Sequence, residues 1–207
     1  MIRYTFPALK CRAKIIRRYA TSISIIRRYA TSASLIESDD MHFLTIILLL
    51  IPWSIAFTQS PDNWIKLEPK DAGFSVMMPA KPIEQVSQNE KLTAHAYIAQ
   101  LDTALYVANY GDYAASMKVS PDEELPAGRD SFNKNLKATL VNSRNISLGG
   151  VPGIEFTSET PGATIRSKIF VKDHRTFQIA AVVPKNVDHA KTVQTFLDSF
   201  EFPKISN

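Results

Sequence analysis

Residues 143–183, SRNISLGGVPGIEFTSETPGATIRSKIFVKDHRTFQIAAVV, decide the fold, because apolar and polar side chains alternate here between short turn signals. Gly149-Gly150 and Pro161-Gly162 are pairs typical of tight turns. The alternation predicts four consecutive strands of an antiparallel sheet. They cover residues 143–148, 151–159, 163–172 and 176–183. The apolar residues of the last two strands are expected to face one another, Ile165, Ile169 and Val171 against Phe177, Ile179, Ala181 and Val183.

More strands are predicted on the N-terminal side of this stretch. Residues 73–79 alternate so that Phe74, Val76 and Met78 share one face. Pro79 and Pro82 then mark the point where the strand leaves the sheet. Three further apolar stretches also have the length and composition of strands. They are residues 64–67, 92–100 and 104–110, the last two joined by a turn around Asp102.

Two helices are predicted in addition to a short helical turn. Ser120 and Glu123 have the spacing of a capping box, and Pro121 takes the tolerated first helical position, but Pro126 is expected to end this turn. The first full helix is predicted from about residue 129 to residue 141. Its apolar face would carry Phe132, Leu136 and Leu140.

The last helix is expected to begin with Asn186 as its N-cap. Its apolar residues recur at helical spacing and predict a buried stripe. The stripe consists of Val187, Ala190, Val193, Leu197 and Phe200. These elements together predict an α+β domain in which a mostly antiparallel sheet of about six strands packs with two main helices, an α/β/α sandwich.

Residues 41–60, MHFLTIILLLIPWSIAFTQS, have the order of parts of a secretory signal peptide. A nine-residue run at 43–51, apolar except for Thr45, precedes a proline and small residues that fit cleavage after Ala56, with cleavage after Thr58 as the second possibility. A membrane-spanning helix needs about 20 apolar residues, and residues 43–57 offer only fifteen. We therefore expect a single exported domain at 57–207, periplasmic or secreted, with membrane anchoring through the 43–57 segment only if cleavage fails.

Residues 1–40 form a separate leader. They contain a tandem repeat, IIRRYATSIS at 15–24 and IIRRYATSAS at 25–34, and two copies are too few to build a stacked repeat fold. The preferred interpretation is that translation starts at Met41 and that residues 1–40 are absent from the mature protein. The alternative start at Met1 would add an arginine-rich organelle transit peptide, which with the signal peptide would direct the chain to an organelle lumen.

The charge of the chain is divided unequally between its parts. Residues 1–40 hold eight basic and three acidic side chains, a net charge of +5, whereas residues 57–207 hold sixteen basic and seventeen acidic ones, a net charge of −1. The domain therefore lacks the basic surplus that nucleic-acid binding requires. The single cysteine, Cys11, lies in the leader, so the domain has neither a disulfide nor a thiol nucleophile.

Three groups of motifs stand out along residues 57–207. The first is Trp64 followed by Gly-Phe-Ser-Val at 73–76, Pro79 and Pro82, the second is Gly-Val-Pro-Gly at 150–153, and the third is Phe-Leu-Asp-Ser-Phe at 196–200. Together they resemble exported PsbP-like domains. The likeness covers most of residues 64–203. It implies an α/β/α sandwich around an antiparallel sheet and a non-catalytic assembly or binding role. It implies no catalytic residues.

The sequence predicts no catalytic, cofactor or metal site. His95, His174 and His189 are not at the spacing of metal ligands. The chain also lacks the Gly-x-Ser-x-Gly motif of serine hydrolases and a phosphate-binding glycine loop. A catalytic set brought together only by the fold stays open as an alternative.

The tyrosines are the candidate functional residues. Tyr97, Tyr106, Tyr110 and Tyr113 lie on two predicted strands and on the irregular segment 111–128. Buried tyrosines commonly keep a hydroxyl at the protein surface, and loops this long are often functional. The first hypothesis is therefore a non-catalytic exported binding or assembly module, for which these residues form a surface for an unknown protein or a small apolar ligand. The alternative is an envelope hydrolase with a site at the 111–128 loop, where a Ser or Asp would lie near His95 or His189.

Overall fold

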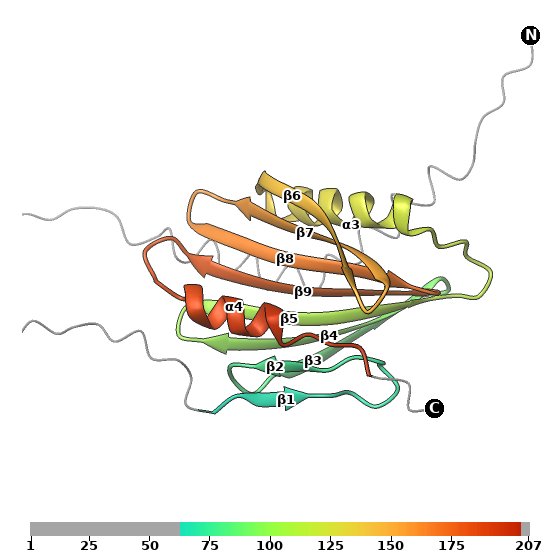
Figure 1. Cartoon of the computed structure of the whole chain (residues 1–207), viewed down its shortest axis with the longest axis horizontal. Coiled ribbons are helices and arrows are strands. Elements are labelled where there is room, and N and C mark those ends of the chain that lie inside the picture. Colours follow the sequence, from blue (N-terminus) through green and yellow to red (C-terminus); the bar gives the residue numbers. More distant parts are fainter. Residues whose placement is uncertain (1–62, 204–207) are drawn as a thin grey trace, which may run out of the picture.

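A computed structural model describes residues 63–203 of this 207-residue chain (Figure 1). The leader, the predicted signal peptide and its cleavage at Ala56 lie outside the described residues. Within residues 63–203, no helix combines the length and the apolar character needed to cross a membrane.

The centre of the fold is an antiparallel seven-stranded sheet with the order β3-β4-β5-β9-β8-β7-β6 (Figure 1). The strands are β3 (Ile83–Gln88), β4 (Leu92–Leu101), β5 (Ala104–Tyr113), β6 (Thr139–Leu148), β7 (Val151–Glu159), β8 (Ala163–Lys172) and β9 (Arg175–Pro184). A separate antiparallel pair consists of β1 (Ile65–Leu67) and β2 (Val76–Met78). The helices are α3 (Pro121–Leu136) and α4 (Ala190–Asp198). The predicted α+β class is confirmed.

The turns of the sheet lie where the sequence predicts them. Gly149 and Gly150, between β6 and β7, have φ values of 58° and 84°. A two-residue hairpin turn of the I′ type needs positive φ at both positions, and glycine reaches it without a steric cost. Asp102 and Asp173 adopt φ values of 53° and 54° in the β4–β5 and β8–β9 turns, because a short polar side chain tolerates this conformation.

Helices and the small sheet cover both faces of the large sheet. α4 packs against β8, β9 and β2, so α4 and the β1–β2 pair lie on one face. α3 packs against β7 and β8 on the opposite face. Figure 1 shows α4 in front of β9 and α3 beside the β6–β7 end of the sheet. The result is the predicted sandwich, with a hydrophobic core on each side of the sheet.

The predicted facing of β8 and β9 is wrong. The register pairs Ile165 with Val182 and Ile169 with Gln178. Ile165 and Ile169 belong to the core under α3, whereas Phe177 and Ile179 belong to the core under α4. Both faces of these central strands are buried, so consecutive residues are apolar, and the alternation does not show which residues share a face.

The predicted boundaries of the first helix are also wrong. α3 is continuous from Pro121 to Leu136 and contains Pro126. A proline inside a helix removes a hydrogen bond and is costly, but α3 buries Leu125, Phe132, Asn133 and Leu136 against the sheet. The chain leaves the helix at Lys137, which has a φ of 53°, and enters β6. Leu140 therefore lies on a strand, with 38% of its surface exposed.

Three smaller expectations fail at element boundaries. Ser120 precedes α3 as predicted, but its side chain forms no cap hydrogen bond. α4 begins at Ala190, not after Asn186, and Asp188 accepts a hydrogen bond from the Ala190 backbone N–H at 3.0 Å. The edge strand β3 was not predicted, because Pro79 and Pro82 indicated that the chain leaves the sheet there.

Candidate functional site

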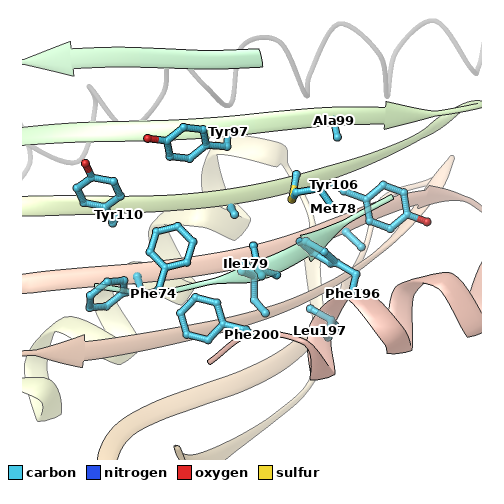
Figure 2. Close-up of a cluster of buried hydrophobic side chains, with 14 of the residues drawn as sticks. Phe74, Met78, Tyr97, Ala99, Tyr106, Tyr110, Ile179, Phe196, Leu197 and Phe200 are labelled. Carbon is cyan, nitrogen blue, oxygen red and sulfur yellow. The ribbon is translucent and has the colours of Figure 1, made fainter. Parts of the chain in front are cut away.

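The structure divides the four candidate tyrosines among three places. Tyr97, Tyr106 and Tyr110 are 8%, 0% and 6% exposed, so their rings belong to the core under α4 and the β1–β2 pair. Figure 2 shows the hydroxyls of Tyr97 and Tyr110 at one end of this core and that of Tyr106 at the opposite end. Tyr113 is half-buried, and its hydroxyl donates to Glu124 of α3 at 3.1 Å.

A polar network lies at the Tyr97 end, near the edge strand β3. The Glu84 carboxylate accepts a hydrogen bond from the Tyr97 hydroxyl at 2.8 Å and lies 3.0 Å from Nδ1 of His95. The hydrogen bond from His95, with a smaller one from Tyr97, lowers the pKa of Glu84 below its ordinary value of 4.5. Burial in turn raises the pKa of the Tyr97 hydroxyl.

The network continues across the sheet through Tyr110. The His95 ring stacks on the Tyr110 ring at a centroid distance of 4.7 Å, and the Arg175 guanidinium lies 5.0 Å from the same ring. Arg175 also forms two hydrogen bonds with the Asp112 carboxylate and donates to the backbone carbonyls of Asp71 and Ala72. These contacts attach the β1–β2 connection to the large sheet, so the network has a structural role.

Replacing Glu84 by glutamine is expected to lower the free energy of unfolding by less than about 1 kcal/mol, because the Glu84 side chain is 47% exposed. A depressed carboxyl pKa stabilises the fold at pH values above the unfolded-state pKa, and this contribution disappears as the pH falls through the folded-state pKa. The difference between wild type and Glu84→Gln should therefore be largest near neutral pH and vanish in acid. Urea unfolding at a series of pH values measures it.

The control is Glu90→Gln, which removes a carboxylate charge from the turn between β3 and β4. A Glu84→Gln difference that stays constant from pH 7 to strongly acid solution would contradict this assignment.

At the opposite end of the core, Tyr106 and His189 link the sheet to the start of α4. The Tyr106 hydroxyl lies 3.1 Å from Nδ1 of His189, and Nε2 of His189 lies 3.8 Å from the Asp102 carboxylate. The His189 side chain is only 8% exposed. Burial raises the pKa of Tyr106, and the nearby Asp102 charge raises it further. The Tyr106 hydroxyl is thus a neutral, buried partner of the imidazole.

Next to His189 lies a cavity of about 220 Å³. It is formed by the start of β8, the end of β9, the connection to α4 and the first turns of α4. The apolar wall residues are Ala181, Val183, Pro184, Val187, Ala190 and Val193, and the polar ones are Thr164, Arg166, Lys185, Asp188 and His189. We call this the α4 cavity.

The charged side chains of the α4 cavity are held by neighbours. Arg166 donates to Gln194 Oε1 at 2.9 Å, and Lys185 donates to Glu159 Oε2 at 2.7 Å. Asp188 accepts from the first N–H of α4. Each of the two basic groups and the acidic group therefore has a partner at the edge of the cavity.

The sequence did not indicate the α4 cavity. Arg166, Lys185 and Asp188 belong to β8, the chain after β9 and the residues before α4, and no motif spacing connects them. The sequence shows that His189 is a histidine without metal-ligand spacing, but its proximity to Tyr106 follows only from the fold. Among residues 63–203 there is no group of three or more His, Cys, Asp or Glu side chains placed to hold a metal ion.

The segment 111–128 is less irregular than predicted. β5 continues to Tyr113 and α3 begins at Pro121, so only residues 114–120 connect them. This connection packs Val119 against the core under α3. His95 stacks on Tyr110, just before this segment, on the face opposite α3. His189 lies at the other end of that core, beside Tyr106. The backbone carbonyl of His174 accepts a hydrogen bond from the Tyr113 N–H at 2.8 Å.

Comparisons with known proteins give a structural match only. No family model matches the sequence, and no curated protein matches it. The fold is similar to the solution structure of cyanobacterial PsbP (CyanoP) from Synechocystis sp. PCC 6803, with a TM-score of 0.50 and 8% sequence identity. The match covers 72% of this chain and 96% of that one. At this identity the likeness establishes the fold alone.

Proposed function

We propose that this chain, whose α+β domain has a PsbP-like fold, acts after export as a non-catalytic binding or assembly module. The observation that carries the proposal is the α4 cavity, whose walls are mainly apolar side chains from β9 and α4. Its volume of about 220 Å³ is below the roughly 300–1,000 Å³ of sites for drug-sized ligands. The cavity therefore suits a small apolar ligand or a single apolar side chain of a protein partner.

The surroundings of the two histidines support binding over catalysis. The imidazole of His189 contacts the hydroxyl of Tyr106, a residue with 0% exposure. A buried hydroxyl is out of reach of a substrate, so this pair does not have the arrangement of an activated nucleophile. The imidazole of His95 is held between Glu84 and the Tyr110 ring. The alternative function, an envelope hydrolase at the 111–128 segment that uses His95 or His189, is less favoured, because both imidazoles are held by these contacts.

Export is the second part of the proposal and rests on the signal-peptide pattern of residues 41–56. Cleavage after Ala56 would release residues 57–207 as a nearly neutral domain in the periplasm or outside the cell. If cleavage failed, residues 43–57 would anchor the same domain to the membrane, and with an organelle leader at 1–40 it would reach a lumen.

The test uses the protein recovered from the envelope fraction of producing cells. Its N-terminus is sequenced first, where Phe57 is expected and a retained Met41 would contradict cleavage. Calorimetric titration with 3-methylbutan-1-ol, a small apolar probe, should then show saturable binding. Ala190→Leu, which fills the rim of the α4 cavity, should weaken it about tenfold or more, since a filled cavity excludes the probe.

Lys191→Leu adds the same side chain one position further along α4, outside the cavity lining, and should leave binding unchanged. The same preparation is assayed with ester and phosphoester substrates. Turnover of either substrate, or equal binding by wild type and Ala190→Leu, would overturn the proposal.

A further inference from the structure

We infer that the α4 cavity accepts a small monocarboxylate with a short aliphatic body. The inference rests on the proposed function, because it names the ligand class of the same site. Its basis is that two basic side chains, Arg166 from β8 and Lys185 from the chain after β9, line the same cavity as a wall of valines and alanines.

The apolar wall selects the body of the ligand. Val183, Val187 and Val193 come from three different segments and line one space, with Ala181 and Ala190 beside them. These side chains offer no hydrogen bonds, so polar groups placed against them would lose their water without compensation. The cavity volume of about 220 Å³ lies below the roughly 300–1,000 Å³ of sites for drug-sized ligands, so a short branched acid fits this space better than a nucleotide.

The basic side chains select the head group. Arg166 uses one donor for Gln194, and its guanidinium lies 3.8 Å from the Glu155 carboxylate. Lys185 uses one donor for Glu159. A guanidinium has five N–H donors and an ammonium three, so both groups retain donors for a ligand.

The nearby acidic groups disfavour a ligand with more than one negative charge. Glu155 and Glu159 already balance part of the positive charge of Arg166 and Lys185. Asp188 lies at the first N–H of α4 and accepts a hydrogen bond from it, so it would repel an anion at that point. The ligand carboxylate is therefore placed towards Arg166 and Lys185, away from the helix start. A phosphate, with its higher charge, would be disfavoured.

Two sources present this chemistry: a free short-chain acid and the C-terminal residue of a protein with an aliphatic side chain. Both combine one carboxylate with a branched apolar group. The experiment distinguishes them with a pair of peptides that end in valine, one with a free C-terminus and one amidated.

The test compares 3-methylbutanoate with 3-methylbutan-1-ol by calorimetric titration of the recovered protein. The acid should bind about tenfold more tightly than the alcohol, the size expected for charge-assisted hydrogen bonds at a partly exposed site. Arg166→Gln and Lys185→Gln should each weaken acid binding about five- to tenfold and so reduce the preference for the acid over the alcohol. Lys191→Gln removes a positive charge from α4 outside the cavity lining and is the matched control.

The outcomes separate this inference from the proposed function. Equal affinities for acid and alcohol, with no effect of Arg166→Gln or Lys185→Gln, would overturn the carboxylate inference and leave an apolar binding site. Failure of both probes to bind would overturn both proposals. Tighter binding of the free-acid peptide than of its amide supports the inference with a protein C-terminus as the source, and binding of 3-methylbutanoate alone supports it with a free acid.

Discussion

Replacing Phe74 by alanine is expected to destabilise the domain by about 3–5 kcal/mol, the range for truncation of a buried phenylalanine. Phe74 is 1% exposed, and its ring lies 5.4 Å from Phe200 and 6.0 Å from both Tyr110 and Phe177 (centroid distances; Figure 2). It therefore connects the chain before β2 with β5, β9 and the residues after α4. Domains of this size have a total stability of about 5–15 kcal/mol, so the loss would be a large part of it.

Urea unfolding followed by circular dichroism measures the change. Phe74→Leu should lower the free energy of unfolding by clearly less than Phe74→Ala does, because leucine retains most of the apolar volume. Ile83→Ala, at a position that is 70% exposed on the edge strand, is the surface control and should lie within about 0.5 kcal/mol of wild type. An unfolding midpoint for Phe74→Ala equal to that of Ile83→Ala would contradict the packing described for this core.

Gly153→Ala is expected to destabilise by about 3 kcal/mol, near the upper end of the usual cost of overpacking. A Cβ at Gly153 would lie 2.5 Å from the Phe170 ring and 2.7 Å from the Ile169 carbonyl oxygen. The ring cannot move away easily, because Phe170 stacks on Phe200 at 5.3 Å and is 2% exposed. The absence of a side chain at Gly153 thus lets the Phe170 ring lie against the β7 backbone, directly opposite it in the β7–β8 pair.

Gly149→Ala in the same hairpin is the matched control. A Cβ there would meet no atom within 4 Å, so only the strain of its positive φ remains, roughly 1–2 kcal/mol. Thermal or urea unfolding should show a clearly lower free energy of unfolding for Gly153→Ala than for Gly149→Ala. The reverse order would show that the close contact at Gly153 does not limit stability.

The hairpins were predictable because their signals are local. Gly149-Gly150 and the apolar alternation around it determine a turn and two strands without information from the rest of the chain. The facing of β8 and β9 was not predictable, because Ile169, Phe170 and Val171 are consecutive apolar residues in strands with two buried faces. Only the helix positions show which of them belongs to which core.

The helix α3 shows how packing outweighs a local signal. Pro126 indicated a helix end, but the burial of Leu125 on one side of it and of Phe132 on the other stabilises one continuous helix. The prediction of a helix up to residue 141 failed for a similar reason. Thr139 and the residues after it pair with β7 instead, a long-range interaction that helical spacing cannot indicate.

The α4 cavity could not be predicted for a geometric reason. Arg166 and Lys185 line the same space because β8 and β9 form a hairpin that pairs Arg166 with Ala181 and Ala163 with Pro184, and α4 then folds back over the same strands. The tyrosines were more conspicuous in the sequence, yet Tyr97, Tyr106 and Tyr110 are mainly core residues. Tyr106 alone adjoins the candidate site, through its contact with His189.

We propose above that the domain binds a ligand in the α4 cavity and does not catalyse its chemical conversion. The most direct measurement is an NMR titration of the ¹⁵N-labelled domain with 3-methylbutanoate, with the probe followed in the same sample. We expect saturable chemical-shift changes confined to the amides of Thr164, Val183, Val187, Ala190 and their neighbours, and a chemically unchanged probe. Shifts scattered over the surface, shifts centred on residues 114–120, or consumption of the probe would contradict it.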